Sequence, residues 1–258
     1  MIVLKDQLGR QVSLSAKPVR IVSLVPSQTE LLSFFGLKNE VVGITKFCVH
    51  PDDWFQQKSR IGGTKTPDIA KIKELRPDLI LANKEENREE DVKLLAEICP
   101  VYISDINNFE QALNMILDVG MLTGKDILAD QLIGEIKSSI KNFPVCSGRV
   151  LYFIWNEPLM AAGPNTFIGS VIEQLGYENA LSDQKARYVG LSESEIGELK
   201  PDVLLLSSEP YPFSKKHRDE LMAKFDLKVV LVDGEIFSWY GSRMLKMAPY
   251  FREHLQQP

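Results

Sequence analysis

Few side chains in this sequence have the type and spacing that covalent or metal chemistry requires. Cys48 and His50 are close in sequence, but a zinc site needs about four ligands, and their neighbours supply no partner at zinc spacing. The sequence lacks a nucleophile elbow, a phosphate loop and the glycine fingerprint of dinucleotide-binding proteins. A binding function is therefore favoured over catalysis, with no intrinsic metal or cofactor. A single axial contact from His50 to the metal of a bound chelate stays open.

Four aromatic residues lie beside predicted loops, where packing in a core is not their only role: Trp155, Tyr188, Trp239 and Tyr240. Flat, stiff rings with one polar group suit a large planar or amphipathic ligand, because little conformational entropy is lost on binding. The alternative is that some of these rings merely pack at the rim of a core. We interpret the group as a candidate surface for covering the apolar faces of a ligand.

Polar side chains follow the predicted strands. Ser27 and Gln28 come after the first apolar run, and Ser27 with Glu30 has the spacing of a helix capping box. Asn83 follows another apolar run and opens the charged stretch 83–91, which is typical of a solvated helix start but could also reach a ligand. Because ligands of parallel α/β sheets bind beyond the carboxyl ends of the strands, these positions are candidates for the site.

An internal repeat predicts the elements that carry these positions. Residues 72–81 and 196–205 share one pattern, a short helix that ends before Pro-Asp and then an apolar run. Matching runs at 20–25 and 149–154 open the two halves, and a third run in each half ends in aspartate. Strands that alternate with helices indicate parallel sheets. The sequence therefore predicts an α/β fold of two similar lobes with mostly parallel sheets and a ligand cleft between the lobes.

A helical region separates the two halves. Apolar positions recur at helical spacing over 108–122 and again over 125–142, with Gly124 between the two stretches and Pro144 after them. We therefore predict three parts: an N-terminal α/β lobe at 1–122, a single connecting helix at 123–144 and a C-terminal α/β lobe at 145–258. A stiff connection of this kind predicts only a small closure on ligand binding.

Composition excludes several classes of protein. The net charge of −5 argues against a nucleic-acid partner, since phosphate binding needs an excess of Lys and Arg. No apolar run approaches the roughly eighteen residues of a membrane span. The three scattered cysteines leave at least one unpaired. The opening residues do not read as a signal sequence, so we expect a cytoplasmic protein, or a periplasmic or surface-anchored one whose signal has been removed.

From residue 18 to about residue 255, the sequence resembles the periplasmic substrate-binding proteins of ABC importers whose two lobes are joined by one helix. It is most similar to their cobalamin-binding branch. The resemblance rests on the segment from Arg20 to Pro51, on the Gly62-Gly63 turn with the following "IAKIKELRPDLILA", and on "IGELKPDVLLL" in the second half.

The resemblance implies positions for ligand binding and for docking. The family's ligand-binding positions fall on Ser27, Gln28, His50, Asn83, Tyr188, Phe237 and Trp239, and Trp155 joins them from its place after a strand. Members that dock onto a transporter carry a glutamate seven residues before each Pro-Asp proline. Ala70 and Ser194 occupy those positions here, so docking onto a permease would rely on neighbouring acidic residues.

The resulting hypothesis is a monomeric substrate-binding protein that captures a corrinoid of the cobalamin type, or a similar metal chelate, for an ABC importer. One alternative is a ferric-siderophore or haem receptor of the same fold, for which Arg187 and Arg243 would supply positive charge. Another is a cytoplasmic chelate carrier or sensor that is not coupled to a transporter. A third is an enzyme on the same scaffold, against which the scattered single cysteines argue.

Overall fold

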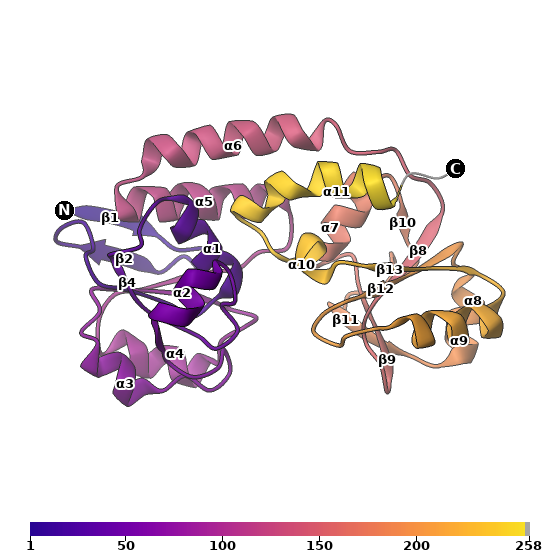
Figure 1. The fold of residues 1–258 in the computed structure, drawn as a ribbon, viewed down its shortest axis with the longest axis horizontal. Coiled ribbons are helices and arrows are strands. Elements are labelled where there is room, and N and C mark those ends of the chain that lie inside the picture. Colours follow the sequence, from indigo (N-terminus) through magenta and orange to yellow (C-terminus); the bar gives the residue numbers. More distant parts are fainter. Residues whose placement is uncertain (256–258) are drawn as a thin grey trace. The chain divides into compact units, whose positions relative to one another are not determined.

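The computed structural model describes residues 1–255, and the contacts within it divide the chain into two units (Figure 1). Unit 1 contains residues 1–105, 110–136 and 240–243, and unit 2 contains 106–109, 137–239 and the chain from 244 onward. Each unit has its own largely parallel sheet, which confirms the predicted α/β class. The units are not continuous stretches of the chain, because the short segment 240–243 packs with unit 1. The predicted bounds of the two lobes and of the connecting helix at 123–144 stay a prediction.

Unit 1 is built on a five-stranded sheet in the order β5-β4-β3-β6-β7, in which every pair of neighbours is parallel. The strands are β3 (Ile21–Ser23), β4 (Val41–Ile44), β5 (Ser59–Arg60), β6 (Leu79–Asn83) and β7 (Val101–Ser104). The helices are α1 (Pro26–Phe34), α2 (Asp52–Gln57), α3 (Ile69–Glu74) and α4 (Glu89–Ala96), with most of α5 (Phe109–Thr123) and α6 (Asp126–Ile140). Every residue of β3, β6 and β7 is buried, as expected for parallel strands covered on both faces.

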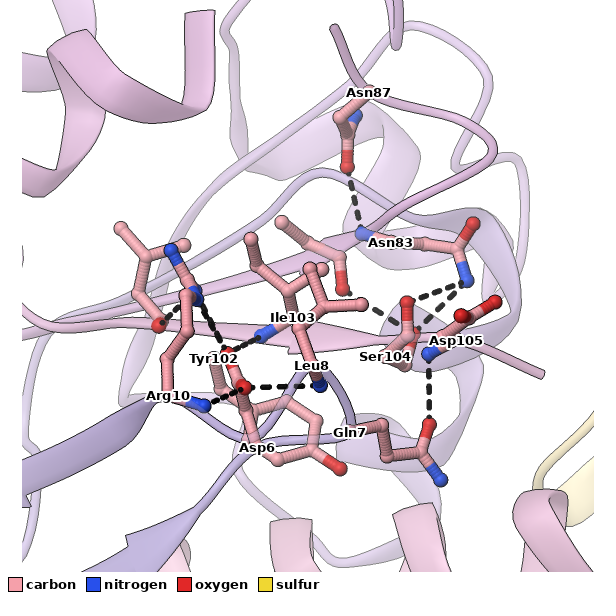
Figure 2. Close-up of polar contacts among 12 residues, drawn as sticks. Asp6, Gln7, Leu8, Arg10, Asn83, Asn87, Tyr102, Ile103, Ser104 and Asp105 are labelled. Atoms are coloured by element: carbon pink, nitrogen blue, oxygen red, sulfur yellow. Dashed lines mark hydrogen bonds and ion pairs between the residues drawn. The ribbon is translucent and has the colours of Figure 1, made fainter. Parts of the chain in front are cut away.

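An antiparallel hairpin of β1 (Ile2–Lys5) and β2 (Gln11–Leu14), which the sequence did not predict, joins unit 1 through Asp6. The buried Asp6 carboxylate accepts hydrogen bonds from the Arg10 backbone N–H at 2.9 Å and from the Arg10 guanidinium at 2.7 Å. It also accepts the Ile103 N–H of β7 at 3.3 Å, as Figure 2 shows. The hairpin is thereby held against the edge of the sheet.

Unit 2 contains a six-stranded sheet in the order β11-β9-β8-β12-β13, with β10 also paired to β8. The strands are β8 (Arg149–Trp155), β9 (Leu159–Ala162), β10 (Glu178–Asn179), β11 (Tyr188–Leu191), β12 (Val203–Ser207) and β13 (Lys228–Val232). The helices are α7 (Phe167–Gln174), α8 (Glu193–Leu199), α9 (Lys215–Phe225), α10 (Gly234–Ser238) and α11 (Met247–His254), and the 3-10 helix η1 (Ser242–Lys246) precedes α11. Strands β8, β12 and β13 are parallel, whereas β9 and β11 run antiparallel to their neighbours.

The internal repeat is present as one hydrogen-bond pattern in both units. In unit 1, Asp78 accepts the Arg20 backbone N–H at 2.9 Å and returns a hydrogen bond from its own N–H to the Arg20 carbonyl at 2.9 Å. In unit 2, Asp202 accepts the Arg149 N–H at 2.6 Å and returns one to the Arg149 carbonyl at 2.8 Å. Each aspartate thus ties the start of one central strand to the start of its neighbour.

The two repeat helices also end in the same way. Arg76 and Lys200, the residues before the two prolines, both have a left-handed backbone with φ of 47°. A side chain rarely adopts this conformation, and a residue before proline is excluded from the right-handed helix, so each helix must end here. The predicted correspondence between the halves is therefore structural as well as sequential.

The predicted helical region forms two helices, α5 and α6, which run side by side (Figure 1). Gly124 lies between them with φ of +65°, which favours glycine, and allows the chain to reverse. Gly120 permits their close approach, because a Cβ there would lie 2.5 Å from the Ala129 Cβ. Among residues 1–255, none of the helices is both long and apolar enough to cross a bilayer.

Candidate functional site

A buried polar cluster lies at the carboxyl edge of the unit 1 sheet, the edge at which its parallel strands end. Ser104, the last residue of β7, accepts hydrogen bonds from Gln28 Nε2 at 2.7 Å and from Asn83 Nδ2 at 3.0 Å. Its own hydroxyl donates to the Ala82 carbonyl at 3.2 Å. The structure therefore brings together two predicted site residues, Gln28 and Asn83, around a serine that the sequence analysis did not select.

Asn83 shapes the loop that follows β6. Its Oδ1 accepts the backbone N–H groups of Glu85 at 2.8 Å and Glu86 at 3.1 Å, and its own N–H donates to Asn87 Oδ1 at 2.8 Å. Figure 2 shows the Asn83 side chain directed toward Ser104 while its backbone meets Asn87. The amide thus organises the start of the charged stretch, and a direct contact from Asn83 to a ligand stays a prediction.

Helix α1 places Ser27 and Gln28 at this edge, but the predicted capping box is absent. The helix begins at Pro26, whose fixed φ suits a first helical position, and its N-cap Val25 offers no side-chain hydrogen bond. Glu30 instead forms an ion pair with Arg243, with 2.7 Å between Glu30 Oε2 and Arg243 Nε. The capping prediction was wrong because the helix already begins at Pro26, which places Ser27 inside the helix and not at its N-cap.

Segment 240–243 covers the N-terminal part of α1 within unit 1. Gly241 has φ of +97° and lies against Leu31, so the chain turns tightly over the helix. The Tyr240 side chain is buried, and burial raises the pKa of its hydroxyl well above the usual range, partly offset by hydrogen bonding with Ser104 and Ser27. Tyr240, one of the four aromatic residues singled out in the sequence, thus covers the polar cluster and directs its hydroxyl toward Ser104 and Ser27.

Cys48 and His50 lie in the loop after β4, but they do not form a joint site. The Cys48 thiol is buried and accepts a hydrogen bond from Thr29 Oγ1 at 3.1 Å, while Thr45 Oγ1 lies 3.1 Å from the same sulfur. Burial raises the pKa of this thiol. His50 is half-buried next to helix α2. Across residues 1–255, no three His, Cys, Asp or Glu side chains group closely enough to hold a metal ion.

Trp155 ends β8 and remains 43% exposed, which suits a ring that meets a ligand. Its ring packs edge-to-face on Tyr211 with centroids 5.8 Å apart. The Tyr211 hydroxyl lies 3.0 Å from His217 Nε2, and His217 Nδ1 accepts the Ser214 N–H at 3.0 Å. Because Nδ1 is an acceptor, the proton of the neutral ring lies on Nε2 and is donated to Tyr211. This chain of contacts fixes the platform under Trp155.

The predicted residues Phe237 and Trp239 lie on and directly after α10, and both are more buried than Trp155. Phe237 is fully buried, with its ring centroid 5.0 Å from Tyr152 and 5.0 Å from Phe251. Trp239 is 8% exposed, and its indole N–H donates to Glu209 Oε1 at 2.9 Å. A ligand contact from either ring stays a prediction. Because Phe237 is fully buried between other rings, we expect it to support Trp239 by packing.

Tyr188 does not lie at the carboxyl end of its strand. It is the first residue of β11 and pairs with Ala162 of β9, so the carboxyl end of its strand is Leu191. The preceding Arg187 donates a hydrogen bond to Asn107, which belongs to the same unit. Tyr188 thus lies beside the loop that precedes β11, and a ligand contact from its ring stays a prediction. The antiparallel strands β9 and β11 themselves were not recognised in the sequence.

The arrangement in each unit suits non-covalent binding. In the described residues, neutral amides and hydroxyls lie at the carboxyl edge of unit 1, while Trp155 and Tyr211 lie after strands of unit 2. Sequence reasoning missed Ser104, Tyr211 and Glu209. Each follows or ends a buried apolar run, so the same strand-end rule could have selected them.

Comparisons with known proteins agree with this fold. The family model described as periplasmic binding protein matches residues 21–227. An uncharacterized ABC transporter substrate-binding lipoprotein of Bacillus subtilis is 26% identical over 261 residues, which cover 95% of this chain and 82% of that protein. A vitamin B12-binding protein of Pectobacterium carotovorum is 21% identical, with 90% of this chain and 87% of that protein covered.

Among solved structures, the petrobactin-binding protein of Bacillus subtilis superimposes with a TM-score of 0.79 at 20% identity, covering 100% of this chain and 99% of that chain. At this identity the likeness concerns the fold alone, and the ligands named for these relatives differ. The family consists of solute-binding proteins and not of enzymes. Since its model spans most of the sequence, the chain belongs to the periplasmic binding protein family.

Proposed function

We propose that this protein binds a corrinoid, or a metal chelate of similar size and polarity, and presents it as a monomer to an ABC importer. The relatives are named as a substrate-binding lipoprotein and a vitamin B12-binding protein, which supports a location in the periplasm or at the cell surface. Binding would use the carboxyl edges of the sheets, where helix ends, amides and hydroxyls can meet the polar groups of the ligand.

The observation that supports the corrinoid proposal is that two basic side chains of unit 1, those of Arg243 and Lys84, are each paired with a carboxylate. The Arg243 guanidinium forms an ion pair with Glu30, and its own side chain is buried while that of Glu30 is half-buried. Lys84, after β6, forms an ion pair with Asp105 at 2.6 Å. An anionic chelate would have to compete with these carboxylates, whereas the amide-rich periphery of a corrinoid matches the neutral Gln28, Asn83 and Ser104.

A ferric-siderophore or haem receptor is the second candidate. Arg187, whose guanidinium donates a hydrogen bond to Asn107, supports it. A ligand with carboxylate or catecholate groups would be attracted by such a cation. The two candidates therefore differ in the charge of the ligand.

Coupling to a permease is part of the proposal. Ala70, on α3, and Ser194, on α8, are both exposed at matching positions of the repeat. Glu193 and Glu195, which flank Ser194, are exposed as well, although Glu193 forms an ion pair with Lys224 and Glu195 accepts hydrogen bonds from Ser192. We propose that these glutamates replace the missing docking carboxylate of α8.

Isothermal titration calorimetry against cyanocobalamin, hemin and a ferric catecholate siderophore tests the proposal. We expect cyanocobalamin to bind most tightly, and we expect Trp155→Ala to weaken that binding about tenfold, because an aromatic contact contributes on the order of 1 kcal/mol. Lys137→Ala, a change at an exposed position of α6, should leave the affinity unchanged. Preferential binding of hemin or the siderophore would overturn the corrinoid proposal in favour of the second candidate.

A further inference from the structure

Glu209 is a half-buried carboxylic acid of unit 2 for which the binding proposal gives no role. It follows β12 in sequence, and one of its oxygens, Oε1, accepts two hydrogen bonds. The donors are the Ser238 hydroxyl at 2.8 Å and the Trp239 indole N–H at 2.9 Å. The two donors are consecutive residues at the end of α10, so a single carboxylate oxygen fixes the end of that helix and the indole after it.

The surroundings of Glu209 are built to keep this contact. Gly234, the first residue of α10, lies so close that a Cβ there would be 2.5 Å from Glu209 Cγ and 2.4 Å from Ser207 Oγ. Ser207 Oγ donates to the Glu209 carbonyl at 2.6 Å, and Tyr152 donates to Ser207 at 3.0 Å. The backbone and the side chain of Glu209 are therefore both held.

Two carboxylates, those of Glu235 and Asp233, act on the Glu209 carboxyl. Burial raises the pKa of its carboxyl, the carboxylates of Glu235 and Asp233 raise it further, and the hydrogen bonds from Ser238 and Trp239 offset part of the increase. The hydroxyl of Tyr152, on β8, is a further titratable group that interacts with it. A glutamate kept here against burial and repulsion needs a compensating function, since an uncharged acceptor could also bond an indole.

We propose that Glu209 is a positioning residue for ligand binding, which fixes the Trp239 indole in the orientation that meets the ligand. This inference rests on the proposed function for its consequence in binding, but the geometry between Glu209 and Trp239 exists without a ligand. It also explains how a largely buried tryptophan can hold one orientation at the end of a five-residue helix.

The first test needs no ligand. The fluorescence of Trp239 is obtained as the difference between the parent and Trp239→Phe, in each of three backgrounds: unchanged Glu209, Glu209→Gln and Glu209→Ala. We expect the wavelength of the Trp239 emission maximum to change in Glu209→Ala, because the indole loses its acceptor, and to be restored in Glu209→Gln. An unchanged signal in Glu209→Ala would overturn the proposal.

The pH dependence of the same signal separates positioning from mere packing. The raised pKa means that Glu209 takes up its proton at a pH above the usual value for glutamate, about 4.3, and a protonated carboxyl is a weaker acceptor. The Trp239 signal of the parent should therefore titrate in this range, while Glu209→Gln should show no titration. An identical titration in Glu209→Gln would contradict the assignment and point to Asp233 or Glu235.

Cyanocobalamin affinity completes the test. We expect Glu209→Ala and Trp239→Phe each to weaken binding about tenfold, and the double variant to be no weaker than Trp239→Phe alone, since Glu209 acts through the indole. Losses that multiply in the double variant would refute action through Trp239. Glu220→Gln, an exposed change on α9, is the matched control. If the parent does not bind cyanocobalamin, the corrinoid proposal fails, and the fluorescence result still decides the role of Glu209.

Discussion

Buried polar side chains in this protein are held in place by hydrogen bonds to side chains on other elements. Ser104 collects hydrogen bonds from Gln28 and Asn83, which lie on separate elements of one sheet edge. Cys48 shows the same principle with a thiol, because two threonine hydroxyls surround its sulfur. These hydrogen bonds satisfy the donors and acceptors that take part in them, although the buried Gln28 Oε1 accepts none among the described residues, and they make the edge of the sheet rigid before any ligand arrives.

The three thiols should be slow to react in the folded protein. Burial raises the pKa of Cys48 and of Cys146, and raises that of Cys99 to about 12. A raised pKa depletes the reactive thiolate, so at pH 8 we expect slow release of colour from an aromatic disulfide reagent. In guanidinium chloride all three cysteines should react at the rate of glutathione, which serves as control. Rapid, stoichiometric modification of the native protein would contradict this.

At the scale of elements, the repeat accounts for what could be predicted. The Pro-Asp pairs are local signals, because proline ends the preceding helix and the aspartate bonds to the neighbouring strand. These pairs predicted the strands β6 and β12. Apolar residues at helical spacing predicted the helices α5 and α6. The antiparallel strands β9 and β11 were missed, since they are short and their pairing depends on a neighbour rather than on their own pattern.

The aspartates of the repeat should contribute comparably to stability. We expect Asp78→Ala to lower the free energy of unfolding by about 1–2 kcal/mol, and Asp202→Ala by a similar or smaller amount, because each loses charge-assisted hydrogen bonds to backbone N–H groups. Urea denaturation measures both changes, with Asp130→Ala, at an exposed position of α6, as control. A loss confined to one of the two aspartates would argue against equivalent roles.

The candidate site could be predicted only in part, because some of its contacts join residues that are far apart in the sequence. Gln28 and Asn83 were found because each follows a strand. The Glu30–Arg243 pair joins positions 213 residues apart, and the contact from Trp239 to Glu209 spans 30 residues. A local pattern, such as the capping-box spacing of Ser27 and Glu30, cannot reveal that Glu30 pairs with a distant arginine.

At the scale of the whole molecule, the division into units does not follow the chain. Segment 240–243 packs with unit 1, although the residues on both sides of it belong to unit 2. Its anchor is the Arg243 guanidinium, 6% exposed, on the Glu30 carboxylate, 15% exposed. A buried ion pair of this kind is costly to break on one side, because the remaining charge stays buried.

Substitution of Arg243 alone should therefore lower the free energy of unfolding more than substitution of both Arg243 and Glu30. We expect Arg243→Ala to lower the free energy of unfolding by about 3 kcal/mol, and the double variant with Glu30→Ala to recover part of this loss. Thermal and urea denaturation of the set measure the coupling. Lys93→Ala, which breaks the exposed pair with Glu89, should change stability little. A double variant less stable than Arg243→Ala would contradict the unpaired-charge explanation.

The return of 240–243 to the first unit also sets an order of events during synthesis. The last of the other unit 1 residues is Ile136, yet Arg243 emerges from the ribosome 243 − 136 = 107 residues later. Until then Glu30 has no guanidinium to meet, and the N-terminal part of α1 has no cover. A nascent chain halted anywhere in that interval would hold an unfinished first unit, so its sheet can be complete in strands while still dependent on the distal end of the polypeptide.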